Sequence, residues 1–260
     1  MNDNIQMSGI LRSVSKPGRY TGGEFNQIIK DKEKTAVRFA FCFPDTYEIG
    51  MSNLGVRILY HCLNLQPSIW CERVYAPWMD MVSEMEKYHL PLTAMESGDP
   101  INTFDFVAFT LQYELCYTTM VRMLMLAGIP VMAAERGEDA PIILGGGPCT
   151  YNAEPIADFF DIFSIGEGEE ALPELCLLYE KMKKDGTYTK AAFLHEAAKL
   201  EGFYVPSLYR ADYCEDGTIR AYTPVYDDIP TKIRKRIVKD MDAVPYPEKF
   251  VVPYIETVHD

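Results

Sequence analysis

Apolar runs and amphipathic stretches alternate along residues 35–185. Short apolar runs that end in turn residues predict β-strands at 35–44, 68–76, 104–111, 141–144 and 161–165. Apolar positions at helical spacing predict helices between and after them, at 45–64, 80–87, 115–127, 153–160 and 166–184. Gly128 and Pro130 follow the third of these helices and mark its end.

Strands that alternate with helices are typical of a parallel sheet with helices on both faces. We therefore expect an α/β fold, a flavodoxin-like (Rossmann-like) doubly wound parallel sheet of about five strands. Crossovers in such sheets are right-handed, so the turns that follow the strands gather at the carboxyl edge. Ligands bind at that edge in this architecture.

Two segments flank this predicted domain. Residues 1–34 are polar and glycine-dotted, and we expect a lead-in segment there. Residues 186–260 predict a small α+β extension, with a helix at 190–200, a hairpin that turns at Asp216–Gly217, and a proline-bearing linker. The linker carries a basic cluster, which is interpreted either as a solvated connector or as a contact for an acidic partner or RNA: Lys232, Arg234, Lys235, Arg236 and Lys239.

Charge and cysteine spacing exclude several classes of function. The formal net charge is −13, which disfavours nucleic-acid binding because phosphate neutralisation needs a surplus of Lys and Arg. There is no apolar run of 18 residues and no signal-peptide core, so we expect no membrane contact and a cytoplasmic location. The seven cysteines form no C-x-x-C pattern, so a zinc or iron–sulfur site within this chain is not expected.

Three groups of turn residues would meet at the carboxyl edge. Asp45 to Ser52 follow the first strand, Thr110 to Glu114 follow the third, and Gly145 to Pro148 follow the fourth and are joined by Gly166 and Glu167. Glycines there let the backbone approach a large flat ligand, although each glycine could equally serve a turn or helix packing. The acidic residues from Glu167 onward complement a helix N-terminus and argue against a phosphate site.

Catalysis has little support in the chain itself. His61, His89, His195 and His259 do not lie on strand-end loops beside a Ser or Cys nucleophile. There is also no G-x-x-x-x-G-K-[ST] sequence for nucleotide triphosphate hydrolysis. We predict no catalytic residues and no metal ligands, and interpret the chain as a binding module.

The stretches PDTYEIGMSNLG, FTLQYEL and LGGGPCTYNAEPIADFFDIFSIGEGEEALPEL together resemble the cobalamin-binding domain at the front of many radical S-adenosylmethionine (SAM) proteins. KPGRYTGGEFN, CERVYAPWMDM and VPYIETVHD extend this resemblance over nearly the whole chain, to a family of fused proteins of that type. In that family the next segment supplies a C-x-x-x-C-x-x-C loop for an iron–sulfur cluster. The resemblance thus implies a downstream radical SAM barrel as partner, which would hold the cluster and SAM.

The resemblance implies that cobalamin binds at the carboxyl edge. Related domains carry D-x-H-x-x-G, whose His binds cobalt; here Asp45, Tyr47 and Gly50 keep the spacing with Tyr in the ligand position. A phenol is a poor cobalt ligand, so we expect no protein ligand from this loop. The implied binding residues are Asp45, Tyr47, Glu48, Ile49, Gly50, Met51, Ser52, Thr110, Leu111, Gln112, Tyr113, Glu114, Gly145, Gly146, Gly147, Pro148, Gly166 and Glu167.

Two functions stay open on this evidence. In the first, the chain holds cobalamin for a parent radical SAM enzyme that performs radical chemistry such as methylation, with the difficult steps carried by the cofactors. In the second, it is a degenerate flavodoxin-like scaffold or substrate-docking module that binds no cofactor, since this fold hosts many unrelated sites. On both interpretations the substrate is undetermined.

Overall fold

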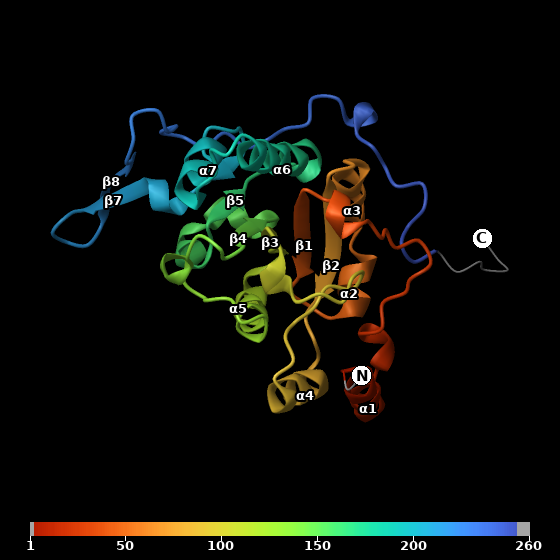
Figure 1. Ribbon diagram of the computed structural model, residues 1–260. Helices are drawn as coiled ribbons and strands as arrows, with labels where there is room; N and C mark the ends of the chain where they lie inside the picture. Colours follow the sequence, from red (N-terminus) through yellow and green to blue (C-terminus); the bar gives the residue numbers. More distant parts are fainter. Residues whose placement is uncertain (1–2, 254–260) are drawn as a thin grey trace, which may run out of the picture.

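A six-stranded sheet in the order β2-β1-β3-β4-β5-β6 forms the centre of the computed structural model, which describes residues 3–253 (Figure 1). Its strands are β1 (Val37–Phe43), β2 (Ile69–Tyr75), β3 (Phe106–Thr110), β4 (Ile142–Gly146), β5 (Ile162–Ser164) and β6 (Phe203–Tyr204). The first five run parallel and β6 pairs antiparallel with β5. The order of the parallel strands is the flavodoxin-like one, so the predicted fold class is confirmed.

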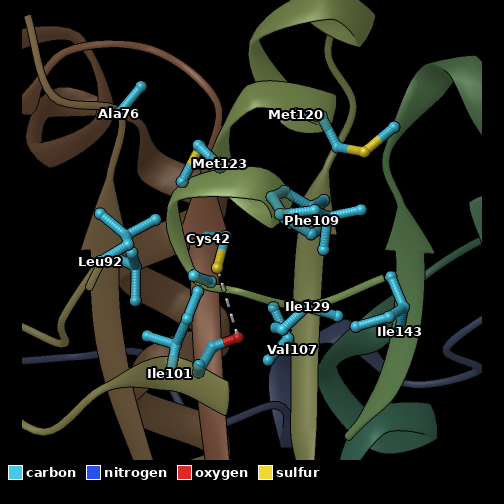
Figure 2. Close-up of a cluster of buried hydrophobic side chains, with 14 of the residues drawn as sticks. Cys42, Ala76, Leu92, Ile101, Val107, Phe109, Met120, Met123, Ile129 and Ile143 are labelled. Carbon is cyan, nitrogen blue, oxygen red and sulfur yellow. Dashed lines mark hydrogen bonds between the residues drawn. The ribbon is translucent and has the colours of Figure 1, made fainter. Parts of the chain in front are cut away.

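Helices cover both faces of the sheet. They are α1 (Asp3–Ser13), α2 (Tyr47–Ser52), α3 (Leu54–Leu65), α4 (Met79–Tyr88), α5 (Tyr117–Leu126), α6 (Gly168–Lys184) and α7 (Lys190–Ala197). One apolar cluster lies on each face of the sheet: α3, α6 and α7 pack on one face, and α4 and α5 on the other (Figure 1). Figure 2 shows the second cluster, in which Met120 and Met123 of α5 lie over Cys42, Phe109 and Ile143 of the sheet.

The predicted helix at 45–64 is two helices in the structure. Asn53 separates α2 from α3, because its side-chain oxygen accepts a hydrogen bond from the Val56 amide at 3.0 Å and starts α3 afresh. The predicted helix at 153–160 is instead a 3₁₀ turn, Glu154–Phe159, preceded by a second one, Pro148–Asn152. Each of these short turns carries a proline in its first two positions, which suits a helix start but not a helix interior.

The sixth strand was not predicted. It has only two residues, Phe203 and Tyr204, too few to show a period, and it is defined by its pairing with β5. The predicted hairpin follows it as β7 (Tyr209–Tyr213) and β8 (Ile219–Pro224). Gly217 takes a φ of +83° in the turn between these strands, a conformation that favours glycine.

The lead-in segment lies against the β2 side of the sheet. Ile28 accepts a hydrogen bond from the Trp70 indole at 3.0 Å, and its amide donates to the Tyr60 hydroxyl at 2.8 Å. The linker returns to the same place, where the Asn26 amide donates to the Val251 carbonyl at 3.1 Å. Residues 1–2 and 254–260, which include His259 and the end of the predicted linker, lie outside the described residues.

No helix within residues 3–253 combines the length and the apolar character needed to cross a membrane.

Candidate functional site at the carboxyl edge

The predicted turns do converge at the carboxyl edge, because β1, β3, β4 and β5 are neighbours in the sheet. The Leu111 amide donates to the Gly146 carbonyl at 2.7 Å, which joins the turn after β3 to the end of β4. The Tyr113 hydroxyl donates to the Asp45 carboxylate at 2.9 Å, which joins the turns after β3 and β1. Residues far apart in sequence therefore form one continuous rim.

A cavity of about 50 Å³ opens at this rim between the sheet and helices α3 and α6, and we call it the slot. Glycines and small or apolar side chains line it: Phe41, Leu59, Ala108, Phe109, Thr110, Leu144, Gly146, Gly147, Ser164, Gly166, Gly168 and Leu172. Four of the predicted site residues, Thr110, Gly146, Gly147 and Gly166, are among them. They come from three different strand ends.

The slot has unoccupied space beside Gly146. A Cβ added there would meet nothing closer than the Phe109 carbonyl oxygen at 4.0 Å. On the opposite wall, a Cβ at Gly168 would lie 3.1 Å from Leu59 and 3.3 Å from Leu172. The leucines of α3 and α6 therefore set the width of the slot, while the sheet side stays open.

Exposed apolar side chains stand on the same rim. Ile49 follows β1, Tyr113 and Leu115 follow β3, and Tyr151 follows β4. Leu115 is 85% exposed and Tyr151 is 64% exposed. Apolar side chains gathered beside a cavity are typical of a surface that binds a ligand or another domain.

The predicted residues 45–52 do not line the slot. The ring of Tyr47 packs edge-on against the ring of Tyr75, with 5.3 Å between the centroids. Gly50 lies beneath that Tyr75 ring, where an added Cβ would come within 2.5 Å of its carbons. Burial raises the pKa of Tyr47, and Glu24 reinforces the rise.

Glu48 binds the lead-in segment. Its carboxylate pairs with Arg19 at 2.9 Å and with Lys16 at 3.1 Å. A hydrogen bond from its own backbone N–H, together with these two cations, lowers the pKa of Glu48 to about 2. Met51 packs partly buried against the α3 side of the core, and the Ser52 hydroxyl donates to the Ile49 carbonyl at 2.8 Å.

Several other predicted site residues serve the rim structure itself. A Cβ at Gly145 would lie 2.7 Å from the Phe163 ring, so this glycine faces the core on the side away from the slot. Leu111 is fully buried, and the Gln112 amide donates to the Thr110 hydroxyl at 2.6 Å. Glu114 and Pro148 each begin a 3₁₀ turn, and the Glu167 carboxylate accepts a hydrogen bond from the Val238 amide.

A buried ion cluster, not anticipated from sequence, lies on the β2 side of the rim. Arg73 contacts Glu96 through its backbone amide at 2.7 Å and its Nε at 2.6 Å, and its Nη2 contacts Glu24 at 3.0 Å. The Arg73 and Glu96 side chains are 4% and 0% exposed. Burial raises the pKa of Glu96, and Arg73 opposes that rise. One guanidinium thus serves two carboxylates, Glu96 and Glu24, and the pairing of buried charges is typical of a structural network.

Two larger hollows lie away from the slot. One of about 460 Å³ lies beside α4 and the end of β2, and one of about 800 Å³ lies between the amino edge of the sheet and the β7–β8 hairpin. In the second, Asp161 lies 3.3 Å from both Arg136 and Lys190. Residues 3–253 contain no group of three or more His, Cys, Asp or Glu side chains arranged to hold a metal ion.

The sequence of the slot region matches a known family model. Residues 55–206, more than half of the chain, match the model described as radical SAM proteins, N-terminal. The chain belongs to this family. The matched stretch runs from the start of α3 to just beyond β6, so it contains the slot-lining residues Leu59, Thr110, Gly146, Gly166 and Leu172.

A relative of this radical SAM N-terminal chain is Uncharacterized protein MJ0966 from Methanocaldococcus jannaschii. It is 26% identical over 175 residues, which cover 67% of this chain and 33% of the relative. The chain therefore spans about a third of the length of the curated relative it matches. No solved structure matches the chain. The predicted link to radical SAM proteins is confirmed, and within such proteins SAM and the iron–sulfur cluster belong to the catalytic domain.

Slot-lining residues outside the predicted set are Leu59, Ser164, Gly168 and Leu172, along with core residues of the sheet. Ser164 lies near the end of the predicted strand 161–165, so its position at the same edge as Thr110 could have been inferred from the strand order. The leucines carry no such signal, because their role depends on how α3 and α6 approach each other.

Proposed function

We propose that this chain is the cobalamin-binding accessory domain of a radical SAM protein. The corrin would lie across the carboxyl edge, and the nucleotide tail would enter the slot. The observation that carries this proposal is the lining of the slot, where Thr110, Ser164 and Gly146 face a cavity that a Cβ at Gly146 would begin to fill.

The hydroxyls and glycines that line the slot suit such a tail, but the slot in this structure is too narrow to hold it. A volume of about 50 Å³ holds one or two water molecules, while small-molecule sites are typically about 300–1,000 Å³. Leu59 and Leu172 form the narrow side, so their side chains would turn or their helices separate on binding. Side-chain rearrangement of this kind is common when a partner binds.

Each part of the rim would then have a distinct role. The hydroxyls of Thr110 and Ser164 would hydrogen-bond the tail, and Tyr113 and Leu115 would cover the apolar edge of the corrin. Tyr47 packs on Tyr75, so we expect no protein ligand to cobalt from this loop. The bound cobalamin would supply the organometallic chemistry, such as methyl transfer, of the parent radical SAM enzyme.

A second candidate function is a docking module without a cofactor. The narrow slot and the exposed side chains of Ile49, Leu115 and Tyr151 favour it, since an apolar rim can also pack on another protein domain. In that case the downstream radical SAM barrel would be the partner. The substrate of the parent protein would be presented by that barrel and not by this chain.

The test is retention of cobalamin. Purified protein is mixed with hydroxocobalamin, desalted, and its visible spectrum recorded. We expect the wild type to keep corrinoid absorbance and Gly146→Leu to lose it, because the new side chain fills the slot. Gly137→Leu is the matched control, since a Cβ at Gly137 meets nothing within 4 Å and lies outside the slot. Colourless wild-type protein would favour the docking module.

A further inference from the structure

The linker crosses both helices that wall the slot. We define residues 236–251 as the latch segment; it runs over α6 and then α3, and is drawn in dark blue in Figure 1. On α6, the Arg236 guanidinium pairs with Glu174 at 2.8 Å and with Glu170 at 3.2 Å. These partners lie on the first two turns of the helix, beside the slot residues Gly168 and Leu172.

The same residue is also joined to the end of β5. The Arg236 amide donates to the Ile165 carbonyl at 2.8 Å, and the Glu167 amide donates to the Arg236 carbonyl at 3.1 Å. Gly166 takes a φ of +105° between these contacts, and an added Cβ would collide with the Arg236 backbone. The latch segment is thus paired like a short extra strand at the mouth of the slot.

Beyond this point the latch segment contacts α3. The Cys62 thiol lies 3.6 Å from the Pro245 carbonyl, to which it donates. The Arg57 guanidinium stacks over the Phe250 ring, 4.8 Å from its centroid. One continuous segment therefore binds α6, which carries Leu172, and α3, which carries Leu59.

We propose that the latch segment controls the width of the slot: docked, it holds α3 and α6 together and the slot closed, and released, it lets the helices separate. Because the latch segment contacts both α3 and α6, it resists separation of these helices. Opening of the slot is therefore coupled to the loss of the latch contacts. The inference rests on the proposed function only for the identity of the slot's occupant. It also gives a role to Arg236, one member of the basic cluster of the linker.

Thiol labelling measures both parts of this proposal without cobalamin. Cys62 reports undocking, because Pro245 lies over it, and Thr110→Cys reports opening of the slot. Iodoacetamide labelling of each site is followed by mass spectrometry, with the partly exposed Cys214 as internal standard. The variant is Arg236→Ala, and the matched control is Arg234→Ala, an exposed residue of the linker just before the latch segment.

We expect Arg236→Ala to raise the labelling rate at both sites by about 2- to 30-fold, the range for loss of two partly exposed ion pairs. Arg234→Ala should leave both rates unchanged. Glu170→Gln combined with Glu174→Gln removes the same pairs from the other side and should reproduce the effect. Faster labelling of Cys62 alone, or of neither site, would overturn the proposal.

A separate arm distinguishes this proposal from the proposed function. If the slot holds cobalamin, Arg236→Ala should take up hydroxocobalamin faster than the wild type does. If both thiols respond and no variant retains the corrinoid, the latch is supported and the cobalamin proposal fails.

Discussion

The two halves of the carboxyl edge carry similar turn residues and are built differently. The half formed by β3, β4 and β5 contains the slot, with open space at Gly146. In the half formed by β1 and β2, the Tyr75 ring covers Gly50 and the Arg73–Glu96 pair is buried nearby, while the hollow of about 460 Å³ lies beside α4. In the first half the space beside Gly146 is open, and in the second the space beside Gly50 is occupied by an aromatic ring.

The contrast between Gly50, in α2, and Gly146, at the end of β4, shows why a glycine at the carboxyl edge is weak evidence for a binding site by itself. At Gly50 the missing side chain makes room for an aromatic ring of the same protein. At Gly146 nothing occupies the equivalent space. The sequence alone does not distinguish the two glycines.

Loss of the buried ion pair in the β1–β2 half of the edge should reduce stability most. Arg73→Ala leaves Glu96 buried without its partner, and breaking a buried pair in this way costs about 3–5 kcal/mol. We expect urea unfolding to show a loss of that order in the free energy of unfolding. Arg210→Ala removes a pair with Asp212 in which both side chains are exposed, and should cost about 1 kcal/mol or less. Equal losses would mean that the buried cluster is not structural.

A direct comparison of the two glycines should give the next largest effect. Gly50→Ala forces a Cβ to within 2.5 Å of the Tyr75 ring, and overpacking of this kind costs about 1–3 kcal/mol. Gly146→Ala meets nothing closer than 4.0 Å and should change the free energy of unfolding by about 0.5 kcal/mol or less. Thermal unfolding of the two variants side by side measures this difference. A larger loss of stability for Gly146→Ala than for Gly50→Ala would show that the space beside Gly146 is occupied and the space beside Gly50 is not.

The smallest effect is a pH dependence of stability that arises from Glu48, in the β1–β2 half of the edge. The pKa of Glu48 is about 2 in the folded protein, below its ordinary value of 4.5. A carboxyl group whose pKa is lower in the folded protein than in the unfolded chain stabilises the folded state. That stabilisation is complete above about pH 4.5 and is lost as the pH falls toward about 2. We expect Glu48→Gln to weaken the pH dependence of the free energy of unfolding between about pH 2 and 4.5, and not outside this range. The Glu48 side chain is 43% exposed, so solvent screening keeps the effect modest. An unchanged profile would show that its pairing with Lys16 and Arg19 does not stabilise the fold.

Much of the fold could be predicted because apolar periodicity reports burial directly. The runs at 104–111 and 161–165 became β3 and β5, since strands covered on both faces are almost continuously apolar. β6 was not predictable, because a two-residue strand has no period. The break at Asn53 was missed because one cap residue decides it.

The site was predictable only in part, and for a physical reason. Topology alone brings Thr110, Gly146 and Gly166 to one edge, which the strand order already implied. The direction in which Tyr47 turns depends on its contact with Tyr75, a residue of another strand. Likewise, the contacts of Arg236 with α6 depend on the path of a linker that has no apolar pattern.

Widening the slot tests directly whether it receives the nucleotide tail of cobalamin. Leu59 is a half-buried residue on the narrow side, and Leu65 is an exposed leucine on the same helix that does not line the slot. The measurement is a hydroxocobalamin titration of the wild type, Leu59→Ala and Leu65→Ala, followed by absorbance. If the slot receives the tail, Leu59→Ala should bind several-fold more tightly than the wild type, because less free energy is spent on opening, and Leu65→Ala should match the wild type. Absence of binding by all three proteins, or the same affinity for all three, would contradict the account.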